Sequence, residues 1–165
     1  MTLPQHLSQP GPRAREFADP TVSRDAGVLQ YQRQLRAHPH ALAGIRRMVS
    51  TRLRAWGYDA CRDTAVFCVS ELLTNVHQHT TSSWCLLTLR AEHGRLMVTV
   101  SDTSPRLPTA GEPDWTSERG RGLFLLQAQA RDWGAEPLDA PGVWAKNVWV
   151  LLDAPCEEPD PRDVA

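Results

Sequence analysis

The sequence lacks a surplus of charge of either sign. Its 165 residues include 18 basic and 19 acidic side chains, which leave a formal net charge of −1. Proteins that bind nucleic acid through its phosphate backbone present a broad positive field, and this balance provides none. We therefore expect no direct binding to nucleic acid.

Cysteine pairs and long apolar runs are also missing. The four cysteines form no CxxC pair and no regular disulfide framework. No stretch approaches the ~20 apolar residues that a membrane-spanning helix needs, and the first residues are polar where a signal peptide has an apolar core. We expect reduced thiols and a cytoplasmic protein that does not enter a membrane.

The residues that are present suffice for one folded domain. Apolar residues make up 41% of the chain and charged residues 22%, which supports a packed interior under a soluble surface. Residues 1–27 and 153–165 contain several prolines among charges and little apolar periodicity, as is typical of flexible segments. The folded unit is therefore expected over residues 28–152.

Apolar spacing predicts three helices and five strands. The first helix begins at Pro39 and ends before Gly57, and the second follows a cap at Asp59 and has the strongest apolar stripe. A third is predicted over 123–130. The strands are predicted at 28–35, as an edge strand, and at 84–90, 96–100, 133–138 and 143–152. This order predicts an α+β fold, a two-layer sandwich of a mixed, mainly antiparallel sheet with about three helices on one face.

Polar residues on the second helix form the main candidate site. Glu71 and Asn75 stand four residues apart and therefore share one face of a helix, and His79 continues the row. An amide oxygen is a suitable ligand for Mg²⁺, and a carboxylate can orient or deprotonate a nucleophile. On spacing alone, the solvated face of an amphipathic helix accounts for the same residues.

Two further features lie on either side of a long polar loop. Asp102 ends an apolar strand, where its carboxylate could accept a hydrogen bond from an adenine amino group or simply stabilise a turn. Gly120-Arg121-Gly122 begins a helix, whose free backbone N–H groups favour an anion, although a tight turn explains such glycines equally well. The pattern GxxxxGK[ST] is absent, so any nucleotide would be held in another way.

In this order, the motifs resemble those of the GHKL or histidine-kinase-like ATPase superfamily, and most closely those of small bacterial anti-sigma-factor serine/threonine-protein kinases. Residues 71–79 resemble the family's N box, Ser101-Asp102-Thr103 its first glycine-box aspartate, Gly120–Leu123 its second glycine box, and 146–149 its final strand. The resemblance covers residues 28–152. It implies a Bergerat-type ATP-binding fold.

The resemblance also implies roles for individual residues. Glu71 would act as the base towards a serine hydroxyl or a water, Asn75 would hold Mg²⁺, and Asp102 would recognise adenine. Residues 104–119 would form a lid over the nucleotide. The other ATP-binding positions would be His79, Arg119, Gly120, Arg121, Gly122, Leu123 and Asn147.

Three positions depart from the family's pattern. Ser104 stands where a glycine usually follows the aspartate, Gln78 occupies a place often held by a basic residue, and Asn147 stands near the threonine of many relatives. These departures allow weak affinity or slow turnover.

The leading hypothesis from the resemblance is an ATP- and Mg²⁺-dependent protein-serine/threonine kinase that acts as an anti-sigma-type switch. It would bind a sigma factor and phosphorylate a STAS-type antagonist, and the resemblance also suggests a homodimer. The alternative is an ATP-binding regulatory module without efficient phosphotransfer. A detached histidine-kinase catalytic domain is less favoured, because there is no room before residue 28 for a phosphoacceptor helical hairpin.

Two histidine-rich segments, 38–40 and 77–79, invite a zinc interpretation. Alternate residues of a helix diverge by about 200° around its axis, so His77 and His79 cannot readily bind one ion. We do not expect a dedicated zinc site.

Overall fold

The computed structural model describes residues 20–108, 121–139 and 142–155. Within these ranges six strands form one antiparallel sheet in the order β1-β2-β3-β4-β6-β5. The strands are β1 (Thr21–Asp25), β2 (Val28–Arg36), β3 (Trp84–Glu92), β4 (Arg95–Asp102), β5 (Asp132–Pro137) and β6 (Lys146–Asp153).

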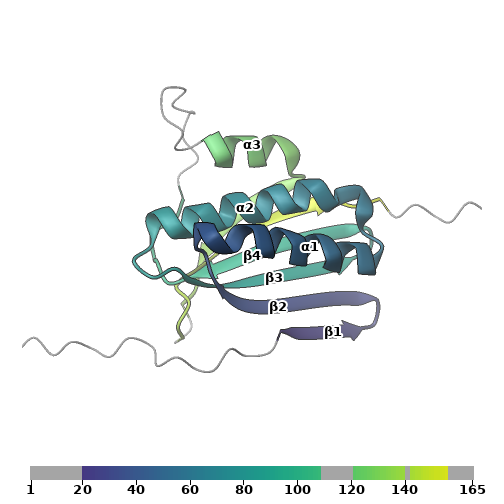
Figure 1. Cartoon of the computed structure of the whole chain (residues 1–165), viewed down its shortest axis with the longest axis horizontal. Helices are drawn as coiled ribbons and strands as arrows, with labels where there is room; N and C mark the ends of the chain where they lie inside the picture. Colours follow the sequence, from purple (N-terminus) through teal and green to yellow (C-terminus); the bar gives the residue numbers. More distant parts are fainter. Residues whose placement is uncertain (1–19, 109–120, 140–141, 156–165) are drawn as a thin grey trace, which may run out of the picture.

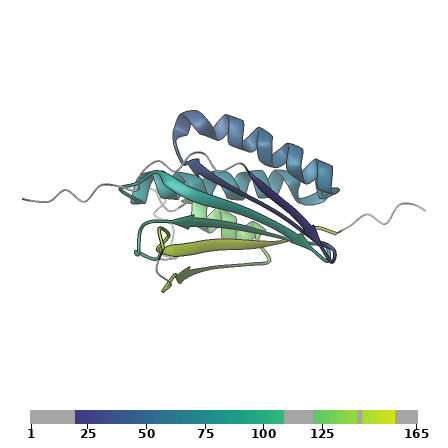
Figure 2. The ribbon, with the colours of Figure 1, turned by 90° about the horizontal axis from the view of Figure 1, so that it is seen from below.

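Three α-helices pack on one side of this sheet (Figures 1 and 2). They are α1 (Leu42–Trp56), α2 (Arg62–His79) and α3 (Arg121–Gln129), and 3-10 turns at Pro39–Ala41 and Asp59–Cys61 precede the first two. The predicted α+β fold, with two layers and helices on one face, is confirmed.

The ends of the helices follow from local chemistry. Gly57 takes a left-handed conformation with φ of 77° and ends α1, as glycine commonly does just after a helix. The expected cap of α2 at Asp59 is wrong: the residue before the helix is Cys61, and no side chain caps its N-terminal end. The Asp59 carboxylate instead accepts a 2.6 Å hydrogen bond from the guanidinium of Arg62.

Two hairpins turn through two-residue loops with positive φ at both positions. Ala26 and Gly27 join β1 to β2, and His93 and Gly94 join β3 to β4, the geometry that a tight hairpin requires. β1 lies inside the segment expected to be a flexible leader, and it makes β2 an inner strand and not an edge strand. The edge-strand expectation is wrong, and the flexible-leader expectation is wrong for Thr21–Asp25, whereas residues 1–19 lie outside the described residues. Every residue of β1 is exposed, so no apolar periodicity marks this strand.

The core lies between the helices and the inner face of the sheet. Alternate residues of β6, namely Lys146, Val148, Val150 and Leu152, are buried, whereas the residues between them face the other side. β6 also extends through Asp153, which forms an ion pair with Arg131. The folded unit therefore includes Asp153, and the expectation that the flexible tail begins at this residue is wrong.

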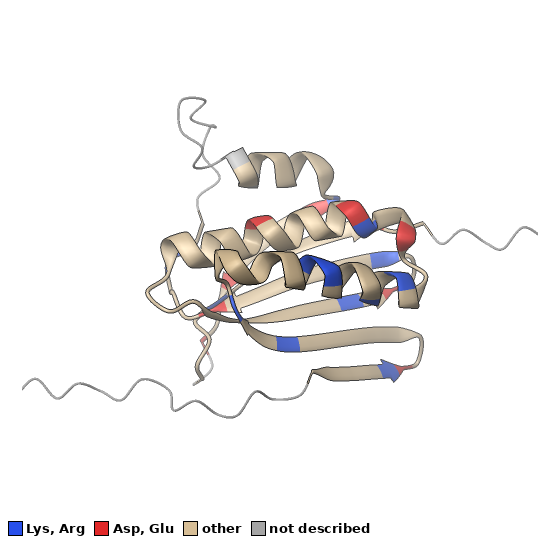
Figure 3. Ribbon diagram, in the orientation of Figure 1, with Lys and Arg blue, Asp and Glu red and all other residues tan. Residues whose placement is uncertain are grey.

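Charge is distributed unevenly over the helices (Figure 3). Helix α1 has four arginines and no acidic residue, whereas α2 carries Asp63 and Glu71. Among residues 20–108, 121–139 and 142–155, no helix has both the length and the apolar character needed to cross a bilayer.

Candidate functional site

A cavity of about 580 Å³ opens between α2 and the sheet. Its walls are one face of α2, the adjoining ends of β4 and β6, residues 104–108 and Gly122 at the start of α3. This volume falls within the range of about 300–1,000 Å³ that is usual for small-molecule sites.

Helix α2 forms one wall of the cavity. Glu71, Asn75 and His79 all line it, because their spacing of four residues places them on one face of the helix. The other side of α2 packs into the core through residues such as Val69 and Leu73, which are fully buried. The row predicted from spacing therefore lines a cavity, with Glu71 and Asn75 half-buried and His79 exposed at its rim.

The backbone of α3 approaches Glu71 closely. A Cβ atom built on Gly122 would lie 1.8 Å from Glu71 Oε2, so only glycine leaves room for the carboxylate in this position. Burial raises the pKa of the Glu71 carboxyl above its ordinary value, and Arg46 on α1 partly opposes the rise. Arg46 is held by a 2.8 Å hydrogen bond from its Nε to Ser70 Oγ.

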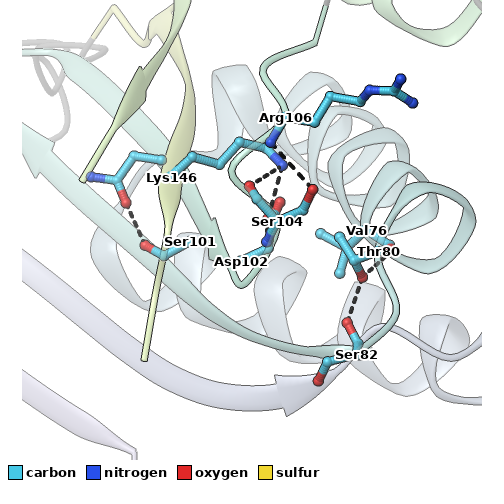
Figure 4. Close-up of polar contacts among 9 residues, drawn as sticks. Val76, Thr80, Ser82, Ser101, Asp102, Ser104, Arg106 and Lys146 are labelled. Atoms are coloured by element: carbon cyan, nitrogen blue, oxygen red, sulfur yellow. Dashed lines mark hydrogen bonds and ion pairs between the residues drawn. The ribbon is translucent and has the colours of Figure 1, made fainter. Parts of the chain in front are cut away.

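A buried ion pair forms the part of the cavity wall that the sheet contributes. Lys146 Nζ lies 2.8 Å from Asp102 Oδ1, and the two side chains are 7% and 4% exposed. Lys146 also donates to the carbonyl oxygen of Ser104 at 3.0 Å, and the Ser104 N–H donates to Asp102 Oδ1 at 2.8 Å. Figure 4 shows this closed set of contacts, in which the Ser104 backbone joins both charged groups.

Lys146 lines the cavity, although the sequence did not predict it as a site residue. Its neighbour Asn147 was the predicted one. Asn147 does not line the cavity. It pairs with Ser101 across the sheet and accepts a 2.6 Å hydrogen bond from the Ser101 hydroxyl. Because side chains alternate along a strand, the strand that brings Lys146 to Asp102 turns Asn147 to the other face. The assignment of Asn147 to the adenine site is therefore corrected.

The structure describes some of the other predicted site residues and not the rest. Gln78 and Ser104, two of the departures from the family's pattern, both line the cavity together with Arg106. Arg119, Gly120 and most of the expected lid, 109–119, lie outside the described residues. Arg121 and Leu123 belong to α3, but the placement of their side chains lies outside the description as well.

The end of α2 is fixed just beside the cavity. The Thr80 hydroxyl donates to the Val76 carbonyl at 2.6 Å and also contacts the Ser82 carbonyl (Figure 4). The Val76 carbonyl also accepts the Thr80 backbone N–H at 3.1 Å, so the backbone and the side chain of Thr80 both bind the last turn of the helix. They hold the last turn of α2, and with it His79, in position.

Histidines from two segments meet near this end of α2. The rings of His38 and His40 stack with centroids 4.8 Å apart, and His77 meets His38 edge-on at 5.6 Å. In the part of the chain that the structure describes, no group of three or more histidine, cysteine or acidic side chains is arranged to hold a metal.

Residues 35–137 match the histidine kinase-like ATPase domain family. The chain belongs to this family. The matched segment contains Glu71, Asn75, Asp102 and Gly122 and ends before β6, so Lys146 lies beyond it. No curated protein matches the chain.

Proposed function

We propose that this chain is an ATP- and Mg²⁺-dependent protein-serine/threonine kinase that acts as an anti-sigma-type regulatory switch. It would bind a sigma factor and phosphorylate a STAS-type antagonist on serine. The observation that carries the proposal is the cavity itself, where Glu71 and Asn75 share one wall with Asp102 and Gly122 nearby. Membership of the histidine kinase-like ATPase domain family supports ATP as the ligand.

The residues present suit a magnesium nucleotide. Asn75 on α2 offers an amide oxygen, a hard ligand of the kind that suits Mg²⁺, and Glu71, one turn earlier on the same helix, offers a carboxylate for proton transfer. Mg²⁺, when bound with ATP, would neutralise phosphate charge. Asp102 supplies an acceptor for the base at the other end, and the cavity volume leaves room for a nucleotide.

Glu71 would carry the proton transfer. Because burial raises its pKa, this carboxylate is a stronger base than an exposed one. It would take the proton of the attacking serine hydroxyl while the serine oxygen bonds to the γ-phosphorus and ADP leaves. Its half-buried place beside Gly122 keeps it within the cavity.

Phosphate transfer from labelled ATP to candidate STAS-type proteins tests this proposal. Glu71→Gln is expected to lower the rate by about 10²–10⁴-fold, the usual contribution of a general base, with ATP affinity nearly unchanged. Glu92→Gln, on β3 and away from the cavity, is the matched control. Transfer by Glu71→Gln at the wild-type rate would exclude Glu71 as the base.

The magnesium assignment needs a separate variant. Asn75→Ala removes the amide oxygen that would hold Mg²⁺, so we expect magnesium-dependent ATP affinity to be lost. Isothermal titration with and without Mg²⁺ measures it. Unchanged magnesium-dependent affinity would contradict the role of Asn75.

An ATP-binding regulatory module without efficient phosphotransfer is the second candidate. One observation favours it: Gln78 stands in the cavity wall, at a place where the family's pattern often has a basic residue, and it brings no positive charge to the phosphates. Tight ATP binding with no phosphate on any partner, with Glu71 intact, would favour this candidate over the kinase.

The homodimer and the cytoplasmic location belong to the same proposal. Light scattering on the purified full chain measures its mass in solution directly. A monomeric mass at all accessible concentrations would remove dimerisation from the proposal.

A further inference from the structure

Two buried charges face the end of the cavity where the base of a nucleotide would lie. Asp102 is 3% exposed and Lys146 is 6% exposed, yet both line the cavity. Charges are costly to bury unless they are paired and hydrogen-bonded. The pair satisfies that requirement, and it leaves some hydrogen-bonding capacity unused.

The unused capacity can be counted atom by atom. Asp102 Oδ1 accepts from both Lys146 Nζ and the Ser104 N–H, and no donor among the described residues reaches Oδ2. The ammonium group of Lys146 has three N–H donors. Two are used by Asp102 Oδ1 and the Ser104 carbonyl, and in the described ranges the third has no acceptor. One acceptor and one donor therefore remain side by side.

We infer that Lys146 and Asp102 together recognise adenine, a conclusion that rests on the proposed ATP-binding function. Asp102 Oδ2 accepts a hydrogen bond from the exocyclic amino group, and Lys146 donates to a ring nitrogen beside that group, N1 or N7. Adenine presents this donor next to an acceptor. Nζ and Oδ1 lie only 2.8 Å apart, so one edge of a purine can contact both side chains.

The hydrogen-bonding groups that remain unused on Asp102 and Lys146 disfavour guanine. Guanine has a carbonyl in place of the amino group, and its N1–H and 2-amino group each need an acceptor. Asp102 has one carboxylate oxygen left, so one guanine donor would be buried without a partner, which costs about 1–3 kcal/mol in general. We therefore expect GTP to bind about tenfold or more weakly than ATP.

The position of Lys146 is compatible with an occupied site. Its ammonium group is held at the end of β4 by Asp102 and Ser104, and the cavity of about 580 Å³ remains with the side chain in place. Lys146 thus forms part of the cavity wall and does not fill the cavity.

Calorimetric titration of the full chain in Mg²⁺ with ATP, 1-deaza-ATP and 7-deaza-ATP tests the inference. One of the two analogues lacks the nitrogen that Lys146 contacts, and we expect it to bind about 10–100-fold more weakly than ATP, as for a hydrogen bond to a charged group. In Lys146→Met the same analogue should bind within about threefold of ATP. Arg95→Met, an exposed position at the other end of β4, should keep the wild-type pattern.

Three outcomes would overturn the inference. In the first, both analogues bind the wild-type protein as tightly as ATP. In the second, the weaker analogue binds Lys146→Met as weakly, relative to ATP, as it binds wild type. In the third, Lys146→Met binds ATP more tightly than wild type, as expected if the lysine blocked the site. The wild-type comparison needs no variant. If Lys146→Met does not fold, the double variant Asp102→Asn/Lys146→Met, which leaves no unpaired charge, replaces it.

Failure of the inference can be distinguished from failure of the proposed function. If the wild-type chain does not bind ATP at all, the proposed function is wrong and the inference falls with it. If ATP binds but neither deaza analogue is weaker, the nucleotide site stands and only the role of Lys146 is lost.

Discussion

The polar side chains that the sheet and helix α2 contribute to the cavity differ in burial and in hydrogen bonding. We call these two regions the sheet end and the helix end. At the sheet end, Asp102 and Lys146 are nearly fully buried and are joined to each other and to the Ser104 backbone. At the helix end, Glu71 and Asn75 are half-buried, and among the described residues no side-chain hydrogen bond engages either of them.

This difference separates two functions of a polar side chain. A paired and buried charge is fixed in place and suits recognition, because its geometry is set before the ligand arrives. A half-buried group with unused hydrogen-bonding capacity can bind a metal or take a proton. Substitutions at the sheet end should therefore affect stability most, and substitutions at the helix end should affect transfer most.

Removal of one partner of the buried pair should give the largest effect on stability. Lys146→Met leaves the Asp102 charge buried and unpaired, so we expect a loss of about 3–5 kcal/mol in the free energy of unfolding. Urea denaturation measures it. The double variant Asp102→Asn/Lys146→Met should recover much of the lost free energy, and Arg95→Met should change it little. A loss below about 1 kcal/mol in Lys146→Met would show that the ion pair contributes little to stability.

Gly122→Ala, at the helix end, should lower phosphate transfer and leave the free energy of unfolding nearly unchanged. The new Cβ would lie 1.8 Å from Glu71 Oε2, and the carboxylate, at the end of a flexible side chain, must move. We expect phosphate transfer to fall about tenfold or more because the base is displaced, while stability changes by less than about 1 kcal/mol, since alanine favours a helix over glycine.

A glycine on another helix provides the control for this substitution. A Cβ on Gly44 of α1 would meet nothing within 4 Å, so Gly44→Ala should leave transfer unchanged. Equal transfer by Gly122→Ala and Gly44→Ala would show that the close approach of α3 does not position Glu71.

The pH dependence of stability should distinguish Glu71 from an exposed carboxylate. Burial raises its pKa in the folded protein above the ordinary value of 4.5, and Arg46 limits the rise. The folded state therefore holds this proton more tightly than the unfolded state, and stability is lost as pH rises from about the ordinary pKa through the folded one. Glu71→Gln removes this titration, so the variant should gain stability relative to wild type across that window.

Urea midpoints of wild type, Glu71→Gln and the control Glu92→Gln, whose carboxylate lies outside the cavity and pairs with Arg90, check the sign when measured in steps between about pH 4 and pH 7. Below the ordinary pKa of the carboxyl, Glu71 is protonated in both states and its contribution disappears. A difference between wild type and Glu71→Gln that stays constant across the series would contradict the effect of burial on this group.

The helix end was more predictable from sequence than the sheet end. Glu71 and Asn75 share a face through the periodicity of one helix, which is a local property. The contact between Asp102 and Lys146 joins residues 44 positions apart, and one sequence does not fix such a distant pairing. The approach of Gly122 to Glu71 is likewise set by how α3 packs on α2.

One missed residue did have a signal in the sequence. Val148, Val150 and Leu152 alternate as core residues of β6, and extending the same alternation backwards places Lys146 on the core face and Asn147 on the opposite one. The resemblance to the family's final strand favours Asn147 instead. β1 had no such signal, because its residues are all exposed and its position depends on pairing with β2.

The smallest expected effect concerns the reactivity of two cysteines, one close to Glu71 and one close to Asp102. Burial raises the pKa of Cys68 to about 11 and that of Cys85 to about 12, and the charges of Glu71 and Asp102 respectively add to these shifts. Because the thiolate is the reactive form, all but a small fraction of either thiol should be unreactive at pH 8. We expect site-resolved iodoacetamide labelling to be slow in the folded protein and slowest at Cys85.

Glu71→Gln removes the carboxylate that adds to the pKa of Cys68, so labelling at that position should rise by about threefold or less while Cys85 stays unchanged. Cys61, whose pKa burial also raises to about 11 without a contribution from either carboxylate, is the internal reference. Mass spectrometry of the labelled peptides gives all three rates. A parallel rise at all three cysteines would indicate general loosening of the fold and would remove the evidence that Glu71 acts on Cys68 through its charge.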